Sequence, residues 1–157
     1  MRQLSIAIGQ SVHMAVASAD QMVVVARIEA PGDLGFSVRV GYRRPLVAAT
    51  SGLVLYAFQP EAIRAEWRAR LKPAAGAGSW SDFETRATTA RKAGYVRADS
   101  VVARQITDLS APIRDAESVV AALTVPYAET PTAIPIPDTI AAILAAAREI
   151  STELGGA

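Results

Sequence analysis

The sequence predicts a single α+β domain in which helices flank an antiparallel sheet. Two observations support this: strand patterns come in two groups of three, and helical patterns are grouped between and after them instead of alternating with single strands. The size agrees, because 157 residues correspond to one ordinary domain, and 51% hydrophobic with 20% charged residues is a normal globular composition. We therefore expect one folded unit over residues 1–157, without internal repeats.

The first group of strands is expected near the N-terminus. Residues 11–18 alternate with the two-residue period of a half-buried strand, and the β-branched run 22–28 is typical of its return strand in an antiparallel hairpin. A turn cluster at residues 31–33 precedes a second alternating stretch at 36–40. That stretch predicts the third strand.

Helical spacing begins after Ala49. Thr50 or Ser51 can cap a first helix that ends at Pro60, and Pro60 also suits the first turn of the second helix. The second helix is expected on the surface, because its apolar stripe is narrow and consists of Ile63, Trp67 and Leu71.

The third helix is expected after a flexible loop. Residues 72–79 contain one proline and two glycines, which predicts the loop. Ser81 followed by Glu84 is a capping-box signature, and Gly94 is a suitable end for the helix that follows.

The second group of strands is expected at residues 95–98, 105–113 and 118–125. Four prolines between residues 126 and 137 predict an irregular extended crossing to the last helix. Asp138 can cap that helix, and the Gly155–Gly156 pair ends it.

The composition excludes several kinds of chemistry. The chain has no cysteine, which removes disulfides and thiolate metal sites, and it has one histidine, His13. A formal net charge of +1 gives no overall attraction to nucleic acid or anionic lipid. No apolar stretch approaches the roughly 20 residues of a membrane span, and no phosphate-binding glycine-rich loop occurs. We expect no metal, no cofactor and no membrane association.

One candidate site arises from the residues alone. The first N–H groups of the helix that starts near Thr50 lack intrahelical partners, so they form a suitable site for a carboxylate, and Gly52 keeps the approach open. The alternatives are that Thr50 and Ser51 only cap the helix and that Gly52 only allows close packing. Ser51 as a hydrolase nucleophile lacks the G-x-S-x-G pattern and is disfavoured, and His13 is expected to be an ordinary surface or hydrogen-bonded core histidine.

Six motifs in order carry a more specific indication. They are S-V-H-M-A-V at 11–16, V-G-Y-R-R-P-L at 40–46, A-T-S-G at 49–52, A-R-K-A-G-Y at 90–95, D-L-S-A-P-I at 108–113 and V-V-A-A-L-T-V at 119–125. This series resembles the effector-binding domain of the IclR family of bacterial transcription factors. The resemblance spans almost the whole chain.

The resemblance implies a GAF-like or profilin-like fold, a curved antiparallel sheet with flanking helices around a pocket for a small metabolite, usually a carboxylate. It implies a cytoplasmic, homo-oligomeric sensor, dimer or tetramer, without catalysis. Family members have a winged helix-turn-helix upstream; because this chain begins almost at the first strand, we expect an excised portion that reaches DNA only through that segment. A GAF-like sensor or interaction module unrelated to DNA binding is the alternative.

The resemblance also implies a set of effector-binding residues. The helix-start amides correspond to Thr50 and Ser51, and the other positions are a polar group at the pocket floor, a late-strand hydroxyl and two wall residues: Asp108, Thr124, Phe36 and Arg44. A buried carboxylate would repel an anionic effector unless it is paired or protonated. Either Arg44 neutralises Asp108, or the effector has a donor or cationic end. Pro126 replaces a second hydroxyl of the family pattern.

Overall fold

The computed structural model describes residues 1–32, 35–131 and 133–156. Within these ranges it has the following elements: α1 (Arg2–Ile8), β1 (Val12–Ser18), β2 (Gln21–Ile28), β3 (Arg43–Pro45), the 3-10 turn η1 (Leu46–Ala48), α2 (Thr50–Ala57), α3 (Glu61–Ala75), α4 (Ala77–Ala93), β4 (Val96–Asp99), β5 (Ile106–Arg114), β6 (Val119–Ala128) and α5 (Ile136–Glu153).

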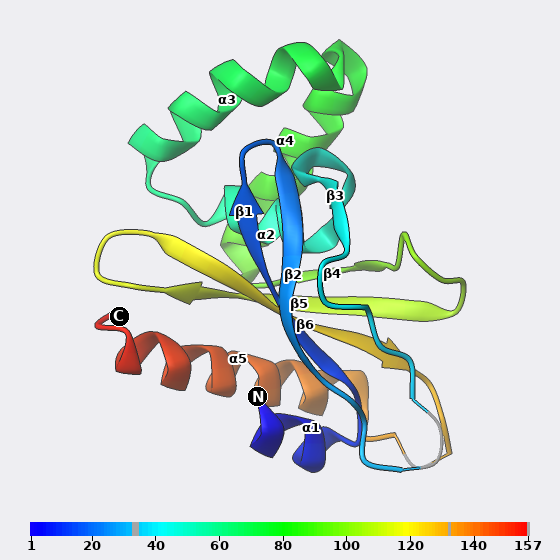
Figure 1. Cartoon of the computed structure of the whole chain (residues 1–157). Helices are drawn as coiled ribbons and strands as arrows, with labels where there is room; N and C mark the ends of the chain where they lie inside the picture. Colours follow the sequence, from blue (N-terminus) through cyan, green and yellow to red (C-terminus); the bar gives the residue numbers. More distant parts are fainter. Residues whose placement is uncertain (33–34, 132, 157) are drawn as a thin grey trace.

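The described strands form one antiparallel sheet in the order β3-β2-β1-β6-β5-β4. Two three-stranded meanders are therefore joined along β1 and β6, where three residue pairs are in register, His13 with Thr124, Met14 with Leu123 and Ala15 with Ala122. The sheet is strongly curled, so β1 and β2 cross the direction of β5 and β6 (Figure 1). The predicted α+β class and its curved antiparallel sheet with flanking helices are confirmed.

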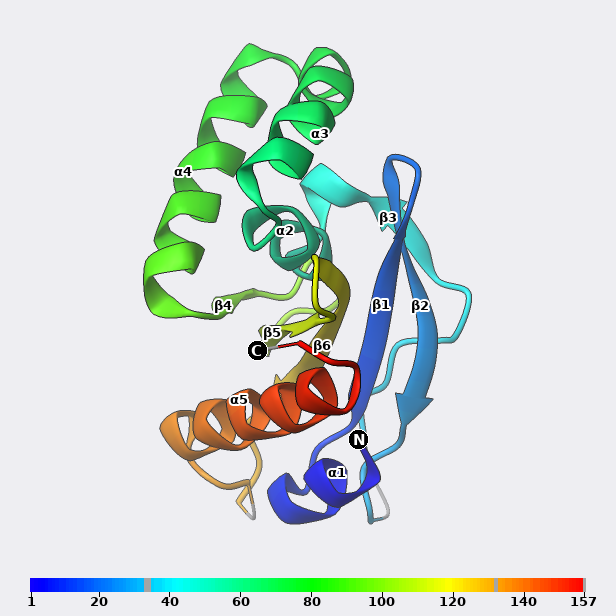
Figure 2. The same cartoon turned by 90° about the vertical axis from the view of Figure 1, so that its left-hand side faces the viewer.

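The helices cover both faces of the sheet. Helices α1 and α5 pack on one face, α2 and α4 pack on the other, and α3 lies outermost beside α4 (Figure 2). The two-residue period of the strands divides the side chains between these layers. Along β1, for example, Val12 packs in the core under α5 and Ala15 packs in the core under α2.

Helix α2 is the central element of its layer because all eight of its residues are buried. The predicted helix is confirmed, but the predicted cap is wrong. The residue at the N-cap position is Ala49, and neither Thr50 nor Ser51 makes a side-chain capping bond, because both lie inside the first turn. Their hydroxyl groups are therefore available for other contacts.

The predicted loop at residues 72–79 is wrong. Helix α3 continues to Ala75, α4 begins at Ala77 instead of Ser81, and the joint is Gly76, whose φ of 78° lies in the left-handed region. Pro73 lies near the C-terminal end of α3, and the two alanines that follow it have the highest helix propensity. The predicted surface position of the second helix is confirmed, because Leu71 is its one buried residue in the described chain. The predicted helix end at Gly94 is also confirmed.

The third strand lies later than predicted. Residues 36–40 contain no strand, and β3 instead pairs with Gln21–Val23. The cause is a turn at Gly41, whose φ is 87°, where the N–H of Gly41 donates to the carbonyl of Val24 before pairing begins. Of the predicted turn at 31–33, Asp33 lies outside the described residues.

The chain ends differ from the prediction in three details. Helix α1 was not predicted, because its seven residues lack a side-chain cap, and Leu4 and Ile8 are its buried apolar contacts. Strand β6 extends through Pro126 to Ala128, so the irregular crossing starts later than expected. Helix α5 begins two residues before Asp138, which lies in its first turn without capping it. No helix of the described ranges combines the length and apolar character of a membrane span.

Candidate functional site

The N-terminal end of α2 lies over a row of polar side chains on the sheet. His13, Thr124 and Ser110 are register partners on β1, β6 and β5, so their side chains share one face. That face belongs to α2, because Ala15 and Ala122, two residues further along the same strands, pack in the α2 core. Three adjacent strands thus present polar groups where a purely apolar core would be expected.

Two of these side chains, Ser110 and Thr124, form a buried cluster with Asp108 on β5 and with Thr50 and Ser51 on α2. We call these five residues the tip cluster. Its centre is the Thr124 hydroxyl, whose Oγ1 lies 2.8 Å from Ser110 Oγ and 3.2 Å from Ser51 Oγ. Both distances are those of hydrogen bonds, so three hydroxyl groups connect α2 to β5 and β6. The structure thus brings together four of the six predicted effector residues.

Asp108 is the one carboxyl group of the tip cluster. It pairs in register with Ala98 and Pro126 and is 8% exposed. Burial raises the pKa of the Asp108 carboxyl above its usual range, whereas the nearby hydroxyls of Thr50 and Ser100 act in the opposite direction. Thr50 Oγ1 itself is buried and makes no hydrogen bond of normal geometry to the described residues. The Thr50 hydroxyl is therefore a buried donor close to the Asp108 carboxyl group.

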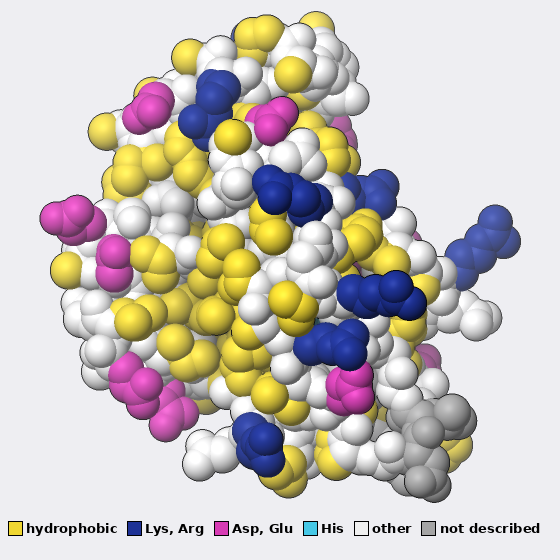
Figure 3. Space-filling view, in the orientation of Figure 1, with side chains coloured by type: hydrophobic (Ala, Val, Ile, Leu, Met, Phe, Trp, Pro, Cys, Tyr) yellow, Lys and Arg dark blue, Asp and Glu magenta, His cyan; other side chains and the backbone are white. Residues whose placement is uncertain are grey.

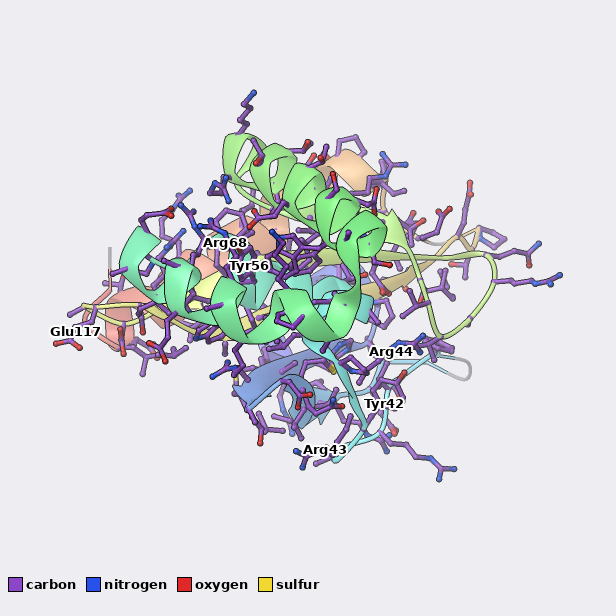
Figure 4. All side chains as sticks on the ribbon, turned by 90° about the horizontal axis from the view of Figure 1, so that it is seen from above. Tyr42, Arg43, Arg44, Tyr56, Arg68 and Glu117 are labelled. Atoms are coloured by element: carbon purple, nitrogen blue, oxygen red, sulfur yellow. The ribbon has the colours of Figure 1, made fainter. Side chains whose placement is uncertain are left out.

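Arg44 and Phe36, the two predicted wall residues, are half-buried outside the tip cluster. Phe36 packs against the α2 core. Arg44 lies on the edge strand β3, where its Nη1 donates to the Tyr42 hydroxyl at 3.2 Å, and Figure 4 shows these two side chains together. No ion pair joins Arg44 to Asp108 in the described structure, and the Nε of Arg44 is buried without a partner. Arg44 does not neutralise Asp108 here.

His13 lies at the end of the polar row and is 5% exposed. Its Nδ1 has no hydrogen-bond partner among the described residues, so the expectation of a surface or fully hydrogen-bonded histidine is wrong. Burial lowers the pKa of His13 to about 4, from an ordinary value of 6.5. The imidazole is therefore neutral at neutral pH.

The depressed pKa of His13 predicts an acid-dependent loss of stability. Between pH 6.5 and about 4, His13 is protonated in the unfolded chain but neutral in the folded chain. The free energy of unfolding therefore falls as the pH falls. The expected loss from His13 is about 3 kcal/mol over that interval. Denaturant unfolding of the wild type and of His13→Gln at each pH measures it.

The difference between the two pH profiles isolates His13 from Asp108. The raised pKa of Asp108 acts with the opposite sign, because the folded chain binds that proton more readily as the pH falls, and it is present in both proteins. Parallel profiles of wild type and His13→Gln would contradict the prediction.

Sequence reasoning missed Ser110 and underrated His13. Ser110 could have been found from strand periodicity, because it lies two residues after Asp108 and must share its face. The register that places His13 opposite Thr124 joins distant strands, and no local pattern encodes it.

The tip cluster is closed in this structure. None of five surface hollows formed by the described residues is lined by Thr50, Ser51, Asp108 or Thr124. The hydroxyl groups of Ser51, Ser110 and Thr124 bond to one another, and α2 covers them.

The chain matches one protein family and several solved structures. The family described as Bacterial transcriptional regulator IclR C-terminal matches residues 1–152. An IclR homologue from Microbacterium hydrocarbonoxydans, solved in complex with 4-hydroxybenzoate, is 25% identical with a TM-score of 0.77, over 98% of this chain and 64% of that one. A putative IclR-family regulator from Rhodococcus sp. is 29% identical with a TM-score of 0.76, over 98% and 60%.

The C-terminal domain of the E. coli transcriptional regulator KdgR shares the fold at 20% identity, with a TM-score of 0.78 over 99% of this chain and 93% of that domain. No match was found among curated proteins. The chain thus spans 60% to 64% of the length of the first two relatives and nearly all of the isolated domain.

These findings define the class of protein: an effector-binding domain of bacterial transcriptional regulators. The chain belongs to the IclR C-terminal family, as its motifs indicated. The family is non-enzymatic, which removes the hydrolase reading of Ser51. The geometry agrees, because the Ser51 hydroxyl is bonded to Thr124 and not to a histidine base.

Proposed function

We propose that this domain senses a small carboxylate-bearing metabolite at the tip cluster and controls DNA binding by a winged helix-turn-helix of the same regulator. The observation that supports this most directly is the buried tip of α2, where the N–H groups of the first turn lie over four polar side chains. A helix start with its positive dipole end favours an anion. The complex of the Microbacterium relative with 4-hydroxybenzoate supports an effector of this type.

Asp108 limits the chemistry of the ligand. Since no arginine neutralises Asp108, a ligand with only acidic groups would face a buried carboxyl group. A ligand with a carboxylate at one end and a hydroxyl or other donor at the other satisfies both requirements, with its carboxylate on the α2 amides and its donor on Asp108. 4-Hydroxybenzoate has both groups. We therefore infer a small hydroxylated acid as the effector class.

Binding at a closed cluster requires rearrangement. The ligand must replace the bond between Ser51 and Thr124, which joins α2 to β6. The equilibrium between the closed and the bound arrangement then shifts by the difference in ligand affinity for the two. To affect DNA binding, this shift must change the contact between the domain and a second subunit.

In this proposal the second subunit is another copy of the domain, bound through an apolar face of the β1–β2 hairpin. Val16 and Val23 are directly opposed and half-buried on the β1–β2 hairpin, and Val25 is 42% exposed. Figure 3 shows hydrophobic side chains gathered on this face, between α3 and α5. Such a face supports self-association as a homodimer or a homotetramer. A regulator of this kind works beside bacterial DNA, so we place it in the cytoplasm.

The Thr124 hydroxyl provides the test. We expect Thr124→Val to weaken binding of hydroxylated aromatic acids about tenfold or more, because it removes a charge-assisted hydrogen bond at nearly constant volume. The measurement is a thermal-shift screen of small acids with 4-hydroxybenzoate included, followed by calorimetry on every acid that stabilises the wild type.

Thr139→Val is the matched control. Thr139 is also fully buried and hydroxyl-bonded, to the carbonyl of Pro135 at 3.2 Å, but it lies on α5 on the opposite face of the sheet. It should lose similar stability and keep the ligand affinity. Equal affinities for Thr124→Val and the wild type, or no acid that stabilises the wild type, would refute the site.

A further inference from the structure

A second concentration of polar groups lies at the other end of α2. We call it the arginine groove, a hollow of about 590 Å³ whose charged lining residues are Arg64, Arg91, Arg114 and Arg148. It forms because β4 pairs with β5 only as far as Ser110, so the later residues of β5 have no strand on that side in the described chain. The end of α4 and helix α5 lie on either side of this edge (Figure 2).

The groove carries four guanidinium groups and no carboxylate among its lining residues. Arg64 has an ion-pair partner outside it, the exposed Glu61. The other three arginines have no carboxylate within 4.0 Å in the part of the chain that the structure describes. Like charges placed together without counter-charges repel one another. The folded chain itself therefore gains no electrostatic stability from grouping these arginines.

Helix capping explains two of the four arginines. Nη1 of Arg64 donates to the carbonyl of Ala57 at 3.3 Å, and Nη1 of Arg114 donates to that of Phe58 at 3.0 Å, so both hold the C-terminal carbonyls of α2. The Arg114 guanidinium also lies over the Phe58 ring, 5.5 Å from its centroid.

Capping leaves several donors unused. The Nε of Arg64 and the Nη1 of Arg91 are buried and have no hydrogen-bond partner among the described residues. Arg91 uses its Nη2 on the Thr88 hydroxyl, at 3.0 Å. A buried donor without a partner costs free energy, and guanidinium groups match the oxygens of carboxylates and phosphates in bidentate pairs.

We propose that the arginine groove binds a small multivalent oxyanion, a phosphate-bearing molecule or a dicarboxylate. Its oxygens pair with the four guanidinium groups of the lining, and a rotation of the Arg64 and Arg91 side chains turns their buried, unpartnered donors toward it. The groove is separate from the tip cluster, since one lies at the last carbonyls of α2 and the other at its first turn. The proposal does not depend on the effector assigned to the tip cluster.

The test is calorimetric titration of the whole chain with inorganic phosphate and, in a parallel arm, with succinate, at ionic strength fixed with sodium chloride. The variant is the double substitution Arg91→Gln and Arg148→Gln, because neither of these side chains donates to the carbonyls at the end of α2. The matched control is Arg86→Gln, on the same helix as Arg91 but outside the groove. We expect binding in the wild type and the control, and at least about tenfold weaker binding in the double variant.

The two arms identify the source of the anion. Binding of phosphate alone, succinate alone or both supports the proposal and assigns the class. A second readout on the wild type, the arginine Nε–H signals in the NMR spectrum, should shift during the titration even if the double variant is unstable. Absence of heat and of NMR shifts with both anions overturns the proposal, as does a double variant whose affinity lies within twofold of the wild type. Thr124→Val should bind these anions normally.

Discussion

Gly52→Ala will lower the free energy of unfolding by about 3 kcal/mol or more, the largest effect that we expect from a single methyl group in this chain. A Cβ at position 52 would lie 2.1 Å from the carbonyl oxygen of Leu46 and 2.7 Å from its carbonyl carbon. Both are backbone atoms of η1, so no side-chain rotation relieves the clash. Alanine favours a helix over glycine by about 1 kcal/mol, which is too little to compensate. Denaturant unfolding monitored by circular dichroism measures the difference.

Gly78→Ala is the matched control. Gly78 also lies in a helix, α4, but an added Cβ there meets no atom within 4 Å. The same substitution should therefore stabilise the protein by about 0.5 to 1 kcal/mol. Equal effects at the two positions would show that helix propensity, and not the approach of η1, decides the outcome. The close approach also answers the question of Gly52 left open by the sequence: it accommodates the protein backbone.

Phe83→Ala will cost about 3 to 5 kcal/mol. Phe83 is 2% exposed and lies on α4, and its ring centroid is 5.1 Å from that of Tyr56 on α2 and 5.4 Å from that of Trp80. Truncation removes one of three aromatic rings that contact one another and leaves a cavity between the two helices, which closes poorly because every residue of α2 is buried. Chemical unfolding of the purified variant measures the loss.

Phe83→Leu separates volume from aromatic contact. Leucine fills much of the space, so we expect a loss of about 1 to 2 kcal/mol, clearly below that of alanine. A loss below about 1 kcal/mol for Phe83→Ala would show that α4 does not depend on this contact. The partly buried hydrogen bonds of Glu84, which accepts from Arg68 at 3.0 Å and from the Tyr56 hydroxyl, would then be the stronger attachment. Figure 4 shows Tyr56 and Arg68 side by side.

The parts of the fold that were predictable from sequence are those whose information is local. The alternation in residues 11–18 and the β-branched run that follows determine β1 and β2, and Gly94 determines the end of α4. The loop predicted around Gly76 failed because a single left-handed residue can join two helices, which composition does not distinguish from a flexible segment. The third strand failed because its position depends on pairing with β2.

The residues of the tip cluster were largely predictable from the sequence, but the contacts between them were not. The resemblance supplied Thr50, Ser51, Asp108 and Thr124, and the structure places these four together. It did not supply their relations: the bond from Ser51 to Thr124 spans 73 positions of the chain, and only the folded sheet brings them into contact. The proposed pairing of Arg44 with Asp108 failed for the same reason, because β3 is an edge strand and Arg44 donates instead to Tyr42.

The junction between β1 and β6 has a mechanical consequence. The two meanders are held to each other by one ladder of three residue pairs in the described sheet, and one of those pairs contains Thr124. A short ladder resists twisting less than a long one, so the angle between the two meanders changes more easily than the angle between β5 and β6, which share nine residue pairs. A ligand that replaces the hydrogen bonds of the Thr124 hydroxyl acts beside this junction. A small change in the angle between the meanders there displaces the distant ends of their strands most.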